Sequence, residues 1–167
     1  MSDTGHTVKS YAEEMQSLND DLIKMGSLTE SQLADAMEAV IKLDKESVDK
    51  IVQNDSKINA LRAAIDNQIT TVLVKRAPMA VDLRITISTM KISHDLERIG
   101  DLAKSVAKKV TPLPIDLPDE LVNSLRRLGD LVQKQLKDVL DAYLNNSKDK
   151  AIAVSYTHLR AHETKRN

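Results

Sequence analysis

The sequence predicts an all-α fold: an antiparallel three-helix bundle, followed by the first helix of a second, incomplete three-helix bundle. Three observations predict this class. The 167 residues include only four Gly and four Pro, too few for the many turns of an all-β protein. Hydrophobic content is 41% although Phe, Trp and Cys are absent, so the core must consist of aliphatic side chains and Met. These side chains recur at helical spacing.

The first two helices are expected at residues 8–43 and from residue 47 to Arg76. In the first, apolar side chains alternate at spacings of three and four, beginning with Met15, Leu18, Leu22 and Met25. In the second, a period of seven relates Ile51, Ile58, Ile65 and Val72. A polar turn at 44–47 separates the two helices, and we expect a break in the second one near Val52.

The third helix is expected at residues 78–110. Pro78 ends the preceding helix because it disfavours helical geometry at the residue before it, and it can itself occupy a first helical turn. Two series with a period of seven run along this helix: Ile85, Ile92, Ile99 and Val106, and Thr89, Leu96, Ala103 and Val110. Both series are predicted to form the buried seam of the bundle.

An internal repeat predicts the second bundle. Residues 25–51 align without a gap to residues 128–154. The identical pairs are Gly26/Gly129, Leu28/Leu131, Gln32/Gln135, Leu33/Leu136, Asp35/Asp138, Ala39/Ala142 and Lys45/Lys148. The fourth helix, expected to end near Asn146, therefore begins a second copy of the first bundle.

The domain organisation follows from these patterns. We expect a first bundle at 1–110, a stiff linker with three prolines at 111–118, and the start of the second bundle at 119–154. Residues 155–167 resemble a peptide that recurs in conceptual translations of sequencing-adaptor DNA, and we expect a non-native tail there. A second acidic helix, which the repeat predicts near position 200, would lie beyond residue 167.

Charge and hydropathy restrict the function classes. The net charge of −1 argues against a strongly basic nucleic-acid-binding protein. No apolar run approaches ~18 residues, so no membrane span is expected, and the N-terminus lacks the pattern of a signal peptide. A cytoplasmic protein is the expectation.

A row of polar residues on the third helix is the candidate site. His94, Glu97 and Asp101 are spaced by three and four, so they share one face of the helix. If the second and third helices are antiparallel neighbours, Asp66 can approach Glu97 or Asp101. Such a set of ligands suits a divalent metal ion or iron. The alternative is an ordinary solvated helix face, because carboxylates four residues apart are common on surfaces.

Two motifs carry a resemblance to a known family. The run Pro78–Arg84 (Pro-Met-Ala-Val-Asp-Leu-Arg), followed by Asp95–Asp101 (Asp-Leu-Glu-Arg-Ile-Gly-Asp), resembles the hallmark of the PhoU family of phosphate-transport accessory proteins. The resemblance implies six helices in two similar bundles, with metal clusters bound by acidic pairs. Glu97 and Asp101 match the motif of the family on the third helix. On the second helix Asp66 matches, but Arg62 stands where the family often has Glu, and it can pair with Glu97 or Asp101 instead.

The resemblance also implies a function. It predicts a negative regulator, not an enzyme, that couples the ATPase subunit of a phosphate ABC transporter to a sensor histidine kinase and forms a homodimer when full length. Two alternatives stay open. One is a metal-dependent enzyme that uses the carboxylate-lined bundle. The other is a purely structural helical dimerisation module, which the seams of the third helix favour.

Overall fold

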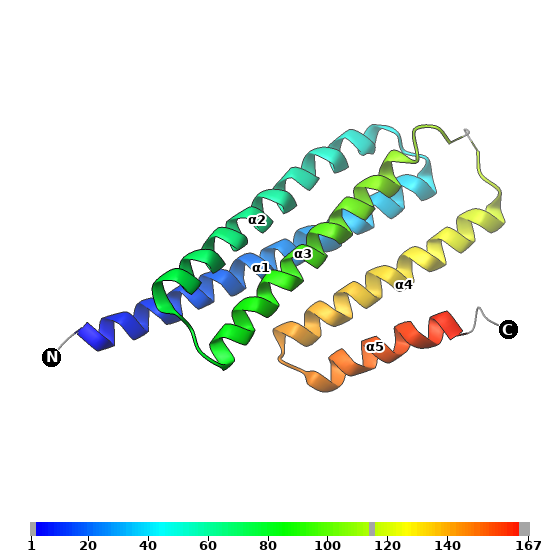
Figure 1. Ribbon diagram of the computed structural model, residues 1–167. Helices are drawn as coiled ribbons and strands as arrows, with labels where there is room; N and C mark the ends of the chain where they lie inside the picture. Colours follow the sequence, from blue (N-terminus) through cyan, green and yellow to red (C-terminus); the bar gives the residue numbers. More distant parts are fainter. Residues whose placement is uncertain (1–2, 114–115, 164–167) are drawn as a thin grey trace. The chain divides into compact units, whose positions relative to one another are not determined.

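The computed structural model describes residues 3–113 and 116–163, which fold into five α-helices (Figure 1). The helices are α1 (Asp3–Lys42), α2 (Glu46–Arg76), α3 (Val81–Lys108), α4 (Asp119–Leu144) and α5 (Lys148–Glu163). The predicted all-α class is confirmed. The chain divides into two compact units, Met1–Leu113 and Pro114–Asn167. No described helix combines the length and the apolarity that a membrane span requires.

Unit 1 is an antiparallel bundle of α1, α2 and α3, which run side by side in alternating directions (Figure 1). Its core is aliphatic. The most deeply buried large side chains are Leu18, Leu22, Met25, Ile51, Ile58, Ile65, Ile69, Val72 and Val110. Burial of each such side chain stabilises the fold by about 1.5–3 kcal/mol, so this core is the main driving force for the bundle.

Helix α2 is continuous, so the break predicted near Val52 is wrong. The residues from Glu46 to Arg76 contain no Gly or Pro, and the buried series passes through this region without interruption. The helix begins after Asp44, whose Oδ1 accepts hydrogen bonds from the backbone N–H groups of Glu46 and Ser47 at 3.0 and 3.2 Å. This carboxylate satisfies two of the free N–H groups at the start of the helix.

Helix α3 begins at Val81, three residues later than predicted. Ala77 adopts a left-handed conformation with φ 44° and ψ 55°, and Ala80 has φ 50° and ψ −107°. These two residues flank Pro78 and stop the helical geometry on both sides of it. Pro78 therefore lies in the connecting turn and not in the first turn of α3.

The buried seam of α3 differs from the predicted one. Thr89, Leu96, Ala103 and Val110 are buried as expected. The other series was assigned wrongly, because Ile85 and Val106 are exposed while Ile92 and Ile99 are half-buried. The stripe is completed instead by small residues: Thr86, Ser93, Gly100 and Ala107.

Close packing explains this choice of small residues. A Cβ atom built on Gly100 would lie 3.1 Å from Cδ1 of Ile58 on α2 and 3.6 Å from Nε2 of Gln32 on α1. Helix α3 therefore approaches both neighbours closely at this level, and larger β-branched side chains are displaced to the flanks of the stripe. A period of seven in the sequence fits both the predicted seam and the observed seam, so it does not distinguish between them.

Unit 2 is a hairpin of α4 and α5. The buried residues of α4 are Gly129, Leu136 and Ala142. Helix α4 ends at Leu144 and is followed by Asn146 with φ 48°, a conformation that Asn tolerates better than most residues. Helix α5 continues to Glu163, past residue 154, where the start of the second bundle was expected to end, and no Gly or Pro interrupts it.

Some of the positions that the internal repeat aligns are buried in both units. Gly26, Leu33 and Ala39 are buried in α1, and their counterparts Gly129, Leu136 and Ala142 are buried in α4. A second set behaves differently. Met25, Thr29 and Ala36 are fully buried in unit 1, whereas their counterparts Leu128, Val132 and Val139 are exposed in unit 2.

Contact with α3 accounts for this difference. The hydroxyl of Thr29 lies 3.5 Å from the backbone carbonyl oxygen of Leu96 on α3. Val132, which is exposed in α4, is therefore the counterpart of a residue that contacts the third helix in unit 1. Among the described residues, unit 2 has only two helices, and no third helix covers this face of α4 as α3 covers Thr29 in unit 1.

We expect Ile65→Ala to lower the free energy of unfolding by about 2–5 kcal/mol, because it leaves a cavity in the core where Ile65 is 0% exposed. Chemical denaturation measures this change. Val74→Ala is the matched control on the same helix, since Val74 is 80% exposed, and its effect should stay within about 0.5 kcal/mol. Equal effects of the two substitutions would contradict the packing described above.

Candidate functional site

The polar residues of α2 and α3 form two separate clusters. The first, called here the Asp66 cluster, consists of Arg62, Asp66 and His94. The second, the Asp55 cluster, consists of Gln32, Asp55, Gly100, Asp101 and Lys104. Of the four residues predicted as metal ligands, the structure brings Asp66 and His94 together and places Asp101 in the other cluster. Glu97 makes no side-chain hydrogen bond or ion pair within the described part of the chain.

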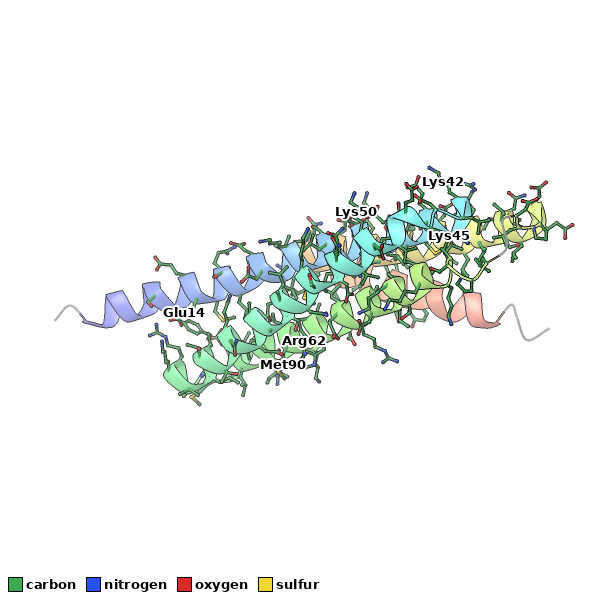
Figure 2. All side chains as sticks on the ribbon, turned by 90° about the horizontal axis from the view of Figure 1, so that it is seen from above. Glu14, Lys42, Lys45, Lys50, Arg62 and Met90 are labelled. Atoms are coloured by element: carbon green, nitrogen blue, oxygen red, sulfur yellow. The ribbon has the colours of Figure 1, made fainter. Side chains whose placement is uncertain are left out.

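Arg62 is the centre of the Asp66 cluster. Its Nη2 lies 3.2 Å from Oδ2 of Asp66 and 3.3 Å from Nε2 of His94. The same His94 nitrogen lies 3.3 Å from Oδ1 of Asp66. One imidazole nitrogen cannot accept from Arg62 and donate to Asp66 at once, so the tautomer or charge of His94 selects between these two bonds. Figure 2 shows Arg62 about midway along the bundle.

This arrangement is unfavourable for a shared metal ion. The guanidinium of Arg62 contacts both Asp66 and His94, and its positive charge repels a metal ion at that place. Arg62 thus pairs with these two residues rather than with Glu97 or Asp101. Over residues 3–113 and 116–163, no group of three or more His, Asp or Glu side chains is arranged to hold a metal.

The two clusters stay apart because they lie at different positions along the axis of the bundle. His94 and Asp101 are seven residues apart on α3, which corresponds to about 10 Å along the helix axis. Asp66 lies beside His94, and Asp55 lies at the level of Asp101 and Lys104. The predicted approach of Asp66 to Asp101 does not occur, because α2 brings a different carboxylate to that level.

The Asp55 cluster joins all three helices of unit 1. Asp55 on α2 is only 3% exposed. Nε2 of Gln32 on α1 donates to Oδ1 of Asp55 and to the carbonyl oxygen of Gly100 on α3, both at 2.9 Å. Nζ of Lys104 on α3 contacts Oδ2 of Asp55 and Oδ1 of Asp101, both at 2.5 Å. A buried carboxylate of this kind is stable only when it is paired and hydrogen-bonded.

Sequence reasoning missed the importance of Asp55. In the sequence, Asp55, Asn59, Arg62 and Asp66 form one polar row along this helix, which was not expected to be buried. A signal was present, because Asp55 is four residues after Ile51 and three before Ile58, both of which lie on the buried face of α2. A charged residue at an apolar position predicts a buried polar network.

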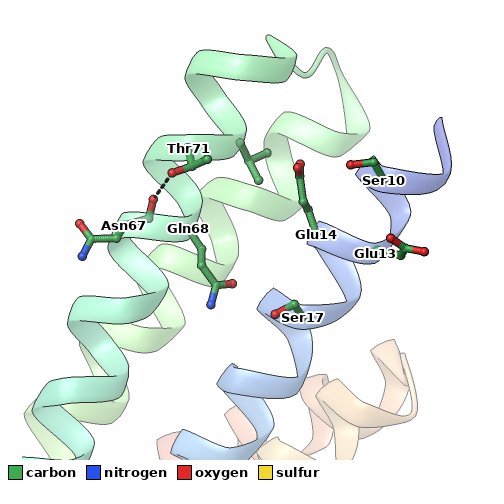
Figure 3. Close-up of a pocket in the computed structure, with 8 residues that line it drawn as sticks. Ser10, Glu13, Glu14, Ser17, Asn67, Gln68 and Thr71 are labelled. Carbon is green, nitrogen blue, oxygen red and sulfur yellow. Dashed lines mark hydrogen bonds between the residues drawn. The ribbon is translucent and has the colours of Figure 1, made fainter. Parts of the chain in front are cut away.

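A groove between α1 and α2 is a further candidate (Figure 3). Its volume is about 560 Å³. The residues that line it are Ser10, Glu13, Glu14, Ser17, Asn67, Gln68, Thr71 and Val72. None of these described residues is basic, and two are acidic, so the groove is unfavourable for a phosphate anion.

The comparisons with known proteins agree with the fold and with the two motifs. Residues 22–110 match the model of the PhoU domain. The chain belongs to the PhoU family. It is 41% identical over 152 residues to a protein of Caulobacter vibrioides named phosphate-specific transport system accessory protein PhoU homolog, covering 90% of this chain and 66% of that protein. A homolog with the same name from Zymomonas mobilis is 38% identical, covering 92% of this chain and 65% of the relative.

Solved structures give the same result for this PhoU-family chain. The crystal structure of PhoU from Pseudomonas aeruginosa matches with a TM-score of 0.81 and 34% identity, over 93% of this chain and 75% of that one. The regulatory protein PhoU from Streptococcus pneumoniae matches with a TM-score of 0.82 and 29% identity, over 92% and 72%. The resemblance inferred from the two motifs is confirmed. The chain spans about two thirds of the length of the first curated relatives it matches.

We expect Asp55→Ala to destabilise unit 1 by about 3–5 kcal/mol, because it leaves Lys104 and the buried Gln32 without their shared partner. Asp101→Ala is the matched control, since Asp101 is half exposed and its bond to Lys104 should contribute less than about 1 kcal/mol. Denaturant titration followed by circular dichroism measures both. A loss below 1 kcal/mol for Asp55→Ala would show that the network is dispensable.

The stability of unit 1 is expected to depend on pH because of Lys104. Hydrogen bonds to Asp101 and then to Asp55 raise the pKa of the Lys104 ammonium group, and they outweigh burial, which lowers it. Because the pKa in the folded state exceeds that in the unfolded state, about 10.4, this pairing stabilises the fold fully below that value. The contribution is lost as the pH rises through the folded-state pKa.

The unfolding free energy of the wild type should therefore fall more steeply above about pH 10.4 than that of Lys104→Met, which cannot titrate there. Denaturant titrations at a series of alkaline pH values measure both slopes. Identical slopes would mean that Lys104 is not held by the two carboxylates.

Proposed function

We propose that this chain is part of a regulatory adaptor of phosphate transport that acts in the cytoplasm. In this proposal it links the ATPase subunit of a phosphate ABC transporter to a sensor histidine kinase and represses the phosphate-starvation response when phosphate is plentiful. The support is the PhoU domain at residues 22–110, together with relatives that are named accessory proteins of phosphate-specific transport systems.

The mechanism is the docking of helix surfaces on partner proteins. Unit 1 is a rigid bundle whose core is closed by the Asp55 cluster, so its outer faces keep fixed positions. The carboxylates of Asp66 and Asp101 are each bonded to a basic side chain of the same unit. Such paired groups suit the positioning of helices better than proton transfer, which supports an adaptor rather than an enzyme.

A bound metal ion, which the sequence analysis predicted, is a second proposal. A divalent metal or an iron cluster would be held by Glu97, Asp101, Asp66 and His94. The described side chains do not fit it, because Arg62 pairs with Asp66 and Lys104 pairs with Asp101, so a cation already occupies each place. No step of the adaptor mechanism therefore depends on a bound metal.

Arg62→Glu tests the metal proposal. It replaces the guanidinium with a second carboxylate one helical turn from Asp66, and we expect this variant to bind more Mn²⁺ or Zn²⁺ than the wild type. Elemental analysis and isothermal titration with each metal measure the difference. Stoichiometric metal in the wild type that is lost in both Glu97→Ala and Asp101→Ala would show instead that Arg62 does not prevent binding.

The adaptor proposal predicts direct binding. The purified chain should bind the purified ATPase subunit of the phosphate transporter and the cytoplasmic region of the sensor kinase encoded in the same genome. Surface plasmon resonance measures both interactions. Absence of binding to both proteins at micromolar concentrations would overturn the proposal.

A further inference from the structure

Helix α4 exposes more large apolar side chains than any other helix over the described residues. Helix α5 packs against α4 as the second arm of a hairpin (Figure 1), yet it leaves these side chains uncovered. They are Leu121, Leu128, Leu131, Val132, Val139 and Leu144. A set of exposed apolar residues that lies along one helix marks an interaction surface.

In unit 1 the equivalent face is closed by a helix. The internal repeat aligns Leu128, Val132 and Val139 with three residues of α1 that are fully buried. One of these three, Thr29, lies against the backbone carbonyl of Leu96 on α3. Among its described residues, unit 2 supplies no third helix of its own. The apolar face of α4 therefore has the form of a helix-binding face whose partner helix must come from outside unit 2.

The spacing along this face indicates which helix fits it. Six positions alternate at spacings of four and three, and we call them the α4 seam: Leu121, Leu125, Leu128, Val132, Gln135 and Val139. The order of spacings is the same when it is read from either end. An antiparallel second copy of α4 therefore places Leu128 opposite Val132. In the same register Leu121 lies opposite Val139, and each pair occurs twice about a two-fold axis.

The charges of α4 do not oppose such a pairing. None of the six seam positions is charged. Asp138 borders the seam, and the antiparallel register sets it opposite Ser124 rather than opposite another carboxylate. Helical spacing places the four basic residues on the other side of α4, where they are exposed: Arg126, Arg127, Lys134 and Lys137. The seam is therefore apolar along its length and carries no facing pair of like charges.

We propose that α4 is a self-association surface, through which two copies of this chain pair in antiparallel orientation along the α4 seam. Two α4–α5 hairpins then form a four-helix bundle. The complementary surface is the same seam on the second copy, so the contact is symmetric and needs no other partner. Antiparallel pairing also brings the helix dipoles into a favourable arrangement. This inference goes beyond the proposed adaptor function and does not depend on it.

Sedimentation equilibrium of the full 167-residue chain tests the seam. We expect the wild type to shift from dimer to monomer as it is diluted. Leu128→Glu places one charge from each copy in the seam, and it should weaken association at least about a hundredfold. Leu144→Glu is the matched control, because Leu144 is similarly exposed on the same helix but lies outside the seam. Its effect should stay below about twofold.

Thermal unfolding followed by circular dichroism shows whether the variants fold. At a concentration where the wild type is monomeric, Leu128→Glu and Leu144→Glu should both unfold at the wild-type temperature, because both side chains are exposed. Amide exchange in α4 of the wild type should slow as the protein concentration rises, since association protects the helix.

A mixing experiment tests the antiparallel register. Val132→Lys should also dissociate the dimer. An equimolar mixture with Leu128→Glu should form heterodimers, because the register sets the new carboxylate of one chain opposite the new ammonium group of the other. Val139→Lys is the matched control, since it lies opposite Leu121, and its mixture with Leu128→Glu should associate less tightly.

Three results would overturn the proposal. A wild type that is monomeric at every concentration would remove the interface altogether. A dimer that is unaffected by Leu128→Glu would place the interface on another surface. A Leu128→Glu mixture that associates no better with Val132→Lys than with Val139→Lys would exclude the antiparallel register.

Discussion

The carboxylate of Asp55 lies where α1, α2 and α3 meet, and the geometry of unit 1 depends on it. Gln32 joins it to the backbone of Gly100, while Lys104 supplies the compensating charge. An aliphatic core without Phe or Trp tolerates small shifts of one helix along another, because its side chains have similar shapes. Directional bonds to one buried group permit a single register, as buried polar groups do in coiled coils. The outer faces thereby keep fixed positions.

The middle of the first bundle and the turn between α2 and α3 differ in the side chains that they expose. Around the middle, Asp55, Asp66 and Asp101 are paired with basic side chains of the same unit, whereas Glu97 is not. At the turn, apolar side chains are exposed on a backbone with positive φ at Ala77 and Ala80.

The sequence was sufficient for the fold class, for the existence of the three long helices of unit 1 and for the family, because period, turn residues and motif are local properties. It was not sufficient for the face that α3 buries, since Ile85 and Thr86 differ by one position and only the approach of α1 and α2 decides between them. The contacts within the candidate site could not be predicted from the sequence for a similar reason. Asp66, His94 and Asp101 were recognised as polar, but which of them meet depends on the relative level of two helices, and that level is set by Gln32 and Gly100.

The uncovered face of α4 has a consequence for the dynamics of the chain. Unit 2 buries little apolar surface, since Leu128, Val132 and Val139 face solvent, while their counterparts in α1 lie in a closed core. Local opening costs least where few side chains are buried. Amide hydrogens of α4 and α5 are therefore expected to exchange with solvent through openings that leave α1 to α3 intact. The molecule would then show two levels of protection rather than a single cooperative one.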